Sequence, residues 1–329
     1  MDIQTAPVSC PCCGSNDKTQ LATQLQNLKR KGSTQHFSFS QCNACGLAYL
    51  DPRPINLSDC YESDYEKHEA RDKKPGAWKI FSRHLMHRIF LNYPPNPGLL
   101  GALFKNLWKA RWQEYSEKHG HMLIPWAGAG KGRLLDVGSG AGDKTVKYAH
   151  VGWKVTGVET TAEAAEQGRK VHGLDIRAGT LEEQKFPDGS FDAAVLNCVL
   201  EHVPAPVELL KEVHRLLAPK GVVVIDVPNF ESRLREVFGP AWTQYSIPEH
   251  FSIPTEKTLR MMAERAGFKV LKVEHRCSMG LNQLAHATAK SLNIPVNGLP
   301  SAKSEIETWF KRECPPPKGE LMLMWAEKA

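Results

Sequence analysis

Four cysteines near the start of the chain have a spacing suited to metal binding. Cys10 and Cys13 form one Cys-x-x-Cys pair, and Cys42 and Cys45 form a second pair after an interval of 28 residues. Each pair aims two thiolates at one point, and two pairs supply the tetrahedral set that structural zinc prefers. A segment of about 50 residues cannot build much of a core, so we expect it to fold around Zn²⁺. Free thiols and an iron–sulfur site are the alternatives.

A glycine-rich turn in the middle of the chain has the pattern of a nucleotide-cofactor site. Leu134–Asp143 is predicted to run from a strand through Gly138 and Gly140 into a helix. Without a Cβ atom, the glycine backbone can bend sharply and approach a ligand closely. Glu159 follows 21 residues after Gly138, at the end of the next predicted strand. A carboxylate at that place can accept hydrogen bonds from both ribose hydroxyls.

The spacing of the glycines helps to distinguish between an S-adenosylmethionine site and a dinucleotide site. The turn has the pattern Gly-x-Gly-x-Gly, one residue shorter than the Gly-x-Gly-x-x-Gly of dinucleotide sites. We interpret the tighter turn as favouring S-adenosylmethionine, whose carboxylate would meet the N–H groups at the helix start. By spacing alone, an NAD site and a turn without a ligand remain alternatives.

Strands and helices alternate around this turn, which indicates a parallel sheet. Strands are predicted at 133–137, 155–158, 175–177, 191–196, 221–227, 268–275 and 320–327. Helices are predicted near 143–150 and at 161–172, 207–217, 255–266 and 281–293. Residues 1–50 are predicted to be loop-like, and 76–93 and 99–121 to form amphipathic helices. The expected fold class is therefore α/β, with a Rossmann-like sheet of seven strands.

Composition divides the 329 residues into three predicted units. These are a zinc ribbon at 1–55, a helical, basic connector or lid at 56–127, and a cofactor-binding domain at 128–329. Residues 65–125 hold eleven Lys or Arg and five Asp or Glu, which accounts for the whole net charge of +6. Such a segment can face an anionic substrate, nucleic acid or a membrane surface. The alternative is an ordinary solvated helical face.

Two features of the sequence bear on location. No run of about 18 apolar residues occurs, so no membrane span is expected. Met1–Ser9 lacks the basic and apolar regions of a secretion signal. We therefore expect a cytoplasmic protein.

Several stretches resemble class I S-adenosylmethionine-dependent methyltransferases, namely Leu134–Asp143, Val155–Glu159, Phe186–Asp192, Glu201–Val203 and Leu217–Gly221. Others resemble the subgroup with an N-terminal zinc ribbon, namely Leu50–Pro54 with Tyr61 and Tyr65, Asp226–Asn229, and Trp242 with Pro248–Phe251. The resemblance covers residues 10–65 and 130–275. It implies the fold and the cofactor, and says little about the acceptor.

The resemblance also implies which residues hold the cofactor: Asp136, Gly138, Ser139, Gly140, Glu159, Thr180, Leu181 and Asn197. In the family, an acidic side chain after the third strand often reaches the adenine amino group. Ala178–Leu181 lacks that acid, so Thr180 and the Leu181 backbone are expected to serve instead. Asn197 is expected near the reacting methyl group.

Three residues are candidates for work on the acceptor. The sulfonium methyl is already activated, so the protein mainly aligns it and in some reactions removes a proton. His250 follows the fifth strand, at the sheet edge where ligands bind, and is the first candidate for a base. Tyr245 is the second. His202 is expected to pack on the adenosyl group or to orient the acceptor. Some relatives have a metal-binding Glu-x-x-Glu-His there, but this chain lacks the first acid, which argues against a catalytic metal.

The sequence leaves several functions open. The first is methyl transfer to the oxygen, nitrogen or carbon of a sugar, a lipid-linked compound or another small molecule. The second is RNA methylation, with the ribbon and the basic segment holding RNA. The third is a binding module that keeps the fold without catalysis, and the fourth is peripheral membrane contact through helix 76–93.

Overall fold

The computed structural model describes residues 2–26, 34–56, 132–276 and 317–329, with the isolated positions 60, 76, 78 and 124. The predicted helices at 99–121 and 281–293 lie outside these residues. The predicted helix at 76–93 and the connector or lid at 56–127 are described only at isolated positions. These elements stay predictions.

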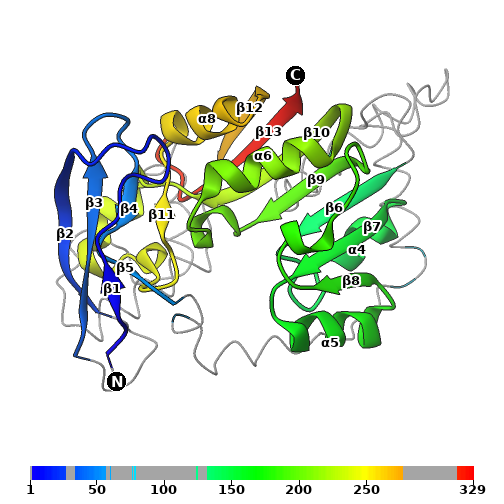
Figure 1. Ribbon diagram of the computed structural model, residues 1–329, viewed down its shortest axis with the longest axis horizontal. Helices are drawn as coiled ribbons and strands as arrows, with labels where there is room; N and C mark the ends of the chain where they lie inside the picture. The colour runs from blue at the N-terminus through cyan, green and yellow to red at the C-terminus, as the bar shows by residue number, and fades with distance from the viewer. Residues whose placement is uncertain are drawn as a thin grey trace.

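A mostly parallel sheet of seven strands forms the centre of the molecule (Figure 1). Its strands are β6 (Arg133–Val137), β7 (Lys154–Glu159), β8 (Asp175–Ala178), β9 (Phe191–Asn197), β10 (Leu217–Pro228), β12 (Phe268–Arg276) and β13 (Leu321–Lys328). Their order across the sheet is β12-β13-β10-β9-β6-β7-β8, and β13 alone runs in the direction opposite to the other six strands. The predicted Rossmann-like sheet is confirmed.

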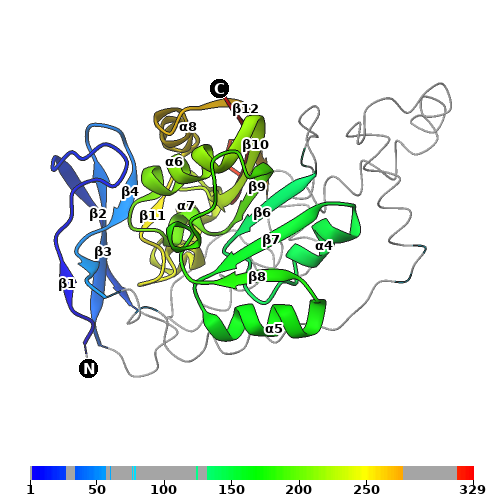
Figure 2. The same cartoon turned by 45° about the vertical axis from the view of Figure 1, so that its right-hand side comes forward.

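Five α-helices lie in the described part of the chain, namely α4 (Thr145–His150), α5 (Ala162–His172), α6 (Pro206–Leu216), α7 (Arg233–Phe238) and α8 (Glu256–Arg265). The figures show α5 against β8 at one edge of the sheet, and α6 and α8 together over its other half (Figure 2). In the part of the chain that the structure describes, each helix is too short or too polar to traverse a bilayer.

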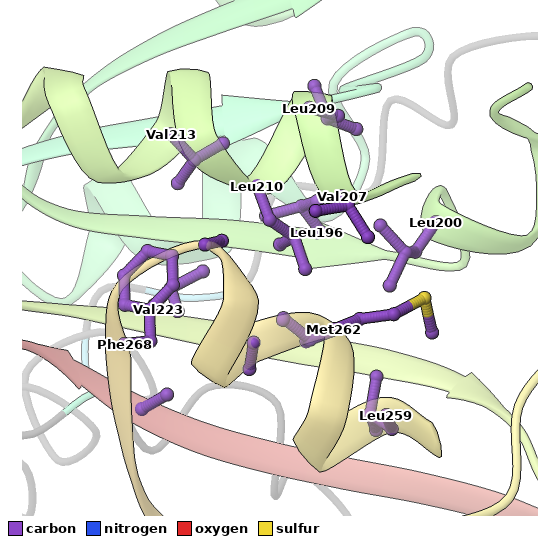
Figure 3. Packing of buried hydrophobic residues seen from close by; sticks show 14 of the residues in the cluster. Leu196, Leu200, Val207, Leu209, Leu210, Val213, Val223, Leu259, Met262 and Phe268 are labelled. Carbon is purple, nitrogen blue, oxygen red and sulfur yellow. The ribbon is translucent and has the colours of Figure 1, made fainter. Parts of the chain in front are cut away.

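Alternate residues of the central strands face two separate cores, as strands buried on both sides require. Leu135 of β6 and Val223 of β10 belong to the core beneath α6 and α8. Their neighbours Leu134 and Val224 point the other way, into the core that contains residues of α4. The apolar side chains of α6 and α8 converge over β9 and β10 (Figure 3). This two-sided burial gives the strand ends a rigid support.

The N-terminal segment forms strands, so its prediction as loop-like was wrong. They are β1 (Thr5–Ala6), β2 (Lys18–Gln26), β3 (His36–Cys42), β4 (Ala48–Leu50) and β5 (Arg53–Pro54). The longest, β2, pairs with β3 through two register shifts, and Gln24 has a positive φ of 60°. Most of β2 is polar and exposed. Irregular pairing with one solvated face removes the period-two pattern that makes a strand visible in a sequence.

A short strand from the second half of the chain completes the N-terminal sheet. β11 (Ser252–Ile253) pairs antiparallel with β4, giving a four-stranded sheet in the order β11-β4-β3-β2 (Figure 1). Next to this pairing, the backbone N–H of Leu50 donates to the carbonyl of Phe251 at 2.9 Å. Cys10 and Cys45 share a core with Met262 of α8. The N-terminal sheet is therefore joined to the rest of the molecule by both backbone pairing and a common core.

Candidate functional site

The glycine turn after β6 is tied to the end of β7. The N–H groups of Gly138 and Ser139 donate to the carbonyl of Val158 at 2.8 and 3.1 Å. Gly138 has a φ of +66°, and a Cβ atom there would lie 2.6 Å from Cγ2 of Val199. Gly140 has a φ of +54°, but a Cβ atom there would meet none of the described residues within 4 Å. The turn is thus closely packed on one side and open beside Gly140.

Glu159 lies directly against this turn, as its spacing predicted. Its buried carboxylate accepts hydrogen bonds from the N–H of Gly140 at 2.8 Å and from the N–H of Thr161 at 2.9 Å. The hydroxyl of Thr160 donates a longer bond of 3.3 Å. The structure therefore brings together the two parts of the predicted cofactor site, the glycine turn and the acid.

Asp136 lies beneath the turn and is almost fully buried. The hydroxyl of Thr145, at the start of α4, donates to its carboxylate at 2.7 Å. Burial raises the pKa of Asp136 to about 7, and the nearby Glu159 carboxylate adds to the rise. The Ser139 hydroxyl is also buried, and has no hydrogen-bond partner among the described residues. Asp136 therefore links the end of β6 to α4. With this raised pKa, its carboxyl titrates near neutral pH.

The loop after β8 contains an acid that sequence reasoning missed. The carboxylate of Glu183 accepts from the N–H of Thr180 at 2.7 Å, and the Thr180 hydroxyl accepts from the N–H of Glu183 at 3.3 Å. Thr-x-x-Glu is the pattern of a capping box, the signal that could have identified Glu183. The Leu181 side chain is buried in the core beneath α6, which leaves only its backbone for a ligand.

Asn197 ends β9 and is half-buried. Its amide donates to the hydroxyl of Tyr148 in α4 at 3.0 Å. The next residue, Cys198, has a φ of +54°, and its N–H donates to the carbonyl of Asp226 at 2.8 Å. The ends of β9 and β10 therefore lie side by side close to the glycine turn.

The structure brings His202 and His250 together, although 47 residues separate them in the sequence. Their ring centroids lie 4.6 Å apart with the planes at 86°. Nδ1 of His202 is 3.0 Å from the carbonyl of Glu249, and Nδ1 of His250 is 2.7 Å from the carbonyl of Gln244. His250 is buried, whereas His202 is half-buried. Both predicted acceptor residues thus lie beside the end of β9.

Glu201 adjoins this histidine pair. The residue is 1% exposed, and burial raises the pKa of its carboxyl to about 8, with the Asp226 carboxylate contributing to the rise. Its Oε2 has no hydrogen-bond partner in the described structure. Asp226 itself accepts from the Arg276 guanidinium at 2.7 Å. The predicted site residues did not include Glu201, although its place next to His202 was the available signal.

Tyr245, the second predicted acceptor residue, lies in a hydrophobic environment. Its ring is 5.3 Å from that of Phe39 and 5.1 Å from that of Trp242. It is 6% exposed, and burial raises the pKa of its hydroxyl. These neighbours place its ring in the core shared by the N-terminal sheet and the segment around α7.

The four predicted metal-ligating cysteines converge on one point. The sulfur atoms of Cys10, Cys13, Cys42 and Cys45 all lie within 4.8 Å of one another. Sγ of Cys10 is 3.6 Å from Sγ of Cys45, and Sγ of Cys13 is 3.4 Å from Sγ of Cys42. Four sulfurs at such distances are compatible with a tetrahedral zinc site.

The two cysteine turns have the same backbone geometry. Gly14 donates to the carbonyl of Cys10 and Gly46 to that of Cys42, each at 2.8 Å, with φ values of +79° and +92°. The positive φ explains why glycine follows each pair. Cys12 is buried but is not part of the sulfur cluster.

Comparison with known proteins gives matches over the central domain. Residues 101–273 match the family described as a methyltransferase domain. The ubiquinone/menaquinone biosynthesis C-methyltransferase UbiE of Citrifermentans bemidjiense is 27% identical over 209 residues, which cover 55% of this chain and 86% of that protein. A probable S-adenosylmethionine-dependent methyltransferase of Mycolicibacterium smegmatis is 29% identical over 171 residues, 52% of this chain and 62% of that protein.

A solved structure is also similar. It is an S-adenosylmethionine-dependent methyltransferase of Thermotoga maritima, described as a possible histamine N-methyltransferase, with 20% identity and a TM-score of 0.45 over 68% of this chain and 98% of that one. The family match covers more than half of the sequence and contains both the glycine turn and Glu159. The protein therefore belongs to the methyltransferase-domain family and is an S-adenosylmethionine-dependent methyltransferase.

Proposed function

We propose that this enzyme transfers the methyl group of S-adenosylmethionine to a small-molecule acceptor at the carboxyl ends of β6, β7, β9 and β10. The observation that carries the proposal is the convergence of Glu159 on Gly140 beside an open space. In parallel α/β sheets, ligands bind outside the carboxyl ends of the strands. The curated relative from Citrifermentans bemidjiense takes its name from the biosynthesis of ubiquinone and menaquinone, which supports an acceptor of small-molecule size.

Within this proposal, each predicted cofactor residue has a separate task. The backbone from Gly138 to Gly140 would hold the methionine part of the cofactor, and Glu159 would accept the ribose hydroxyls. Thr180 would lie toward the adenine, and Glu183, whose carboxylate accepts from the Thr180 N–H, would supply the acid that the sequence pattern lacked. Asn197, held by Tyr148, would lie near the methyl group.

The acceptor would lie next to His202 and His250. His202 belongs to the 3₁₀ turn that follows β9, His250 packs against its ring, and the half-buried His202 can be reached from solvent. A histidine there can orient a hydroxyl or remove a proton from it. Tyr245 is supported less well, because its ring packs between Phe39 and Trp242.

For the four cysteines we propose a structural zinc ion. Four thiolates leave no open position for chemistry, and bound zinc can supply roughly 10–16 kcal/mol of apparent binding free energy to a small unit. Because β4 of this unit pairs with β11, just after His250, the zinc would also stabilise the loop that bears the histidine. This supports a structural role for the N-terminal sheet over a role in holding RNA.

Calorimetric titration with S-adenosylhomocysteine tests the proposal. The wild-type protein should bind it in the micromolar range, and Glu159→Gln should weaken binding by at least about tenfold, since hydrogen bonds to a charged group contribute about 1.5–3 kcal/mol. The matched control is Glu166→Gln, an exposed acid on α5. A folded wild-type protein that binds no S-adenosylhomocysteine would contradict the proposed cofactor site.

A further inference from the structure

We propose that Glu201, His202 and His250 form a second metal site, which takes a divalent transition-metal ion beside the acceptor. The proposal concerns a different place and a different donor set from the four cysteines. It revises the expectation from the sequence, which lacks the first acid of Glu-x-x-Glu-His, because His250 supplies the third donor instead. The existence of the site depends only on these side chains, whereas its role toward the acceptor rests on the proposed function.

The three side chains converge although they come from two segments. A carboxylate oxygen of Glu201 and one ring nitrogen from each histidine all lie within 4.8 Å of one another. Glu201 and His202 belong to the 3₁₀ turn Leu200–His202, and His250 comes from the loop before β11. The two segments are joined by a 2.7 Å hydrogen bond from the N–H of Phe251 to the carbonyl of Glu201. The cluster is therefore held together by the backbone.

Both imidazoles are oriented as metal ligands commonly are. Each Nδ1 lies within hydrogen-bond distance of a backbone carbonyl, that of Glu249 for His202 and that of Gln244 for His250. A carbonyl oxygen can only accept, so each Nδ1 must carry the hydrogen and the lone pair lies on Nε2. A carbonyl that accepts from the other ring nitrogen, and so fixes the tautomer and the ring orientation, is a usual partner of a metal-bound histidine.

The carboxylate of Glu201 supplies an independent observation. The residue is 1% exposed, yet Oε2 has no hydrogen-bond partner in the described structure. An unpaired buried oxygen of this kind costs free energy, and a cation at the cluster would offset that cost. The charged groups that act on it are Asp226, itself paired with Arg276, and Lys144.

The donor set indicates the type of ion. Two imidazoles and one carboxylate suit zinc, iron, manganese or cobalt better than calcium, which prefers oxygen ligands alone. Three protein ligands leave coordination positions open, as in catalytic rather than structural sites. Val199, two residues before Glu201, lies against Gly138 of the cofactor turn. An open position at this cluster could thus hold an acceptor oxygen close to the cofactor. The ion would then take the place of a histidine base, because both Nε2 lone pairs are ligands, and it would favour loss of the acceptor proton.

A titration with Co²⁺ tests the site directly. The full chain, with zinc at the cysteines, is titrated with Co²⁺, and bound metal is measured by elemental analysis and visible absorption. We expect one Co²⁺ per chain beyond the zinc, with d–d bands and without thiolate-to-cobalt charge transfer. His250→Gln and Glu201→Gln should each weaken binding by at least about tenfold. His214→Gln, which removes a histidine of α6 outside the cluster, is the matched control and should bind as the wild type does.

Each outcome decides the proposal. No additional Co²⁺ on the zinc-loaded wild type, or equal binding by folded His250→Gln and Glu201→Gln, would overturn the site. If the buried Glu201→Gln fails to fold, the half-buried His202→Gln takes its place. S-adenosylhomocysteine binding is measured on the same samples: binding without Co²⁺ uptake overturns only the metal site, and Co²⁺ uptake without binding contradicts only the proposed cofactor site.

Discussion

The carboxylate of Glu159 lies 2.8 Å from the backbone nitrogen of Gly140, whose N–H donates to it. One hydrogen bond thus joins the end of β7 to the turn that follows β6. Among the described residues, none lies within 4 Å of a Cβ atom built on Gly140, whereas Gly138 is in close contact with Val199. The two glycines therefore have different roles, and this difference can be measured.

Gly140→Ala should weaken S-adenosylhomocysteine binding by about tenfold or more while it lowers stability by only about 1–2 kcal/mol. Stability falls because a left-handed φ is unfavourable by about this amount for a residue with a Cβ atom. Binding weakens because the new methyl group enters the space that the cofactor would occupy. Calorimetry and urea unfolding measure the two effects. Unchanged affinity in Gly140→Ala would place the cofactor elsewhere.

Gly138→Ala should mainly destabilise the fold. Its Cβ atom would lie 2.6 Å from the Val199 side chain, so overpacking of about 1–3 kcal/mol adds to the φ strain. Urea unfolding should therefore show a larger loss of stability than for Gly140→Ala. Equal losses for the two variants would contradict the contact with Val199.

Asp136 should make the stability of the cofactor-free protein fall as pH rises. Its pKa is about 7 in the folded state against an ordinary value of 3.8, so the folded state holds a proton that the unfolded state has lost. The unfolding free energy should then fall between these two values, by at most about 4 kcal/mol for this group. Asp136→Asn lacks this dependence, so its stability relative to the wild type should grow from pH 4 to pH 7. Parallel pH profiles for the two proteins would contradict the prediction.

Loss of one cysteine ligand should destabilise the loop that contains His250. Cys13→Ser should lose zinc and increase hydrogen exchange at residues 48–54 and 246–253, because β4 and β11 pair there. Cys12→Ala, which leaves the sulfur cluster complete, is the control and should keep both zinc and protection. Zinc loss with unchanged hydrogen exchange at 246–253 would show that the metal does not stabilise this loop, and would contradict the prediction.

Two substitutions of Tyr245 distinguish a packing role of this residue from a catalytic role. Tyr245→Ala should cost about 3–5 kcal/mol of stability, as for other large buried aromatic rings, whereas Tyr245→Phe keeps the ring between Phe39 and Trp242. In methyl-transfer assays, Tyr245→Phe should therefore retain kcat. A loss of about a hundredfold, the size expected for removal of an acid–base group, would instead assign the hydroxyl a catalytic role.

The sequence by itself determined the central sheet, the glycine turn with Glu159, and the two cysteine pairs. Each of these depends on local features, such as apolar runs in strands buried on both faces, glycines required at positive φ, and ligands spaced within a turn. The distance along the chain from Gly138 to Glu159 is also short, because one helix and one strand separate them.

Only the tertiary structure decided the arrangement of the acceptor side. Three of its features are contacts between segments distant in the chain: the pairing of β4 with β11, the contact of His202 with His250, and the packing of Tyr245 in a shared core. The same packing buries Glu201 and leaves its Oε2 without a partner in the described structure. No local period or spacing encodes such contacts, because they depend on how two sheets and their helices share a core.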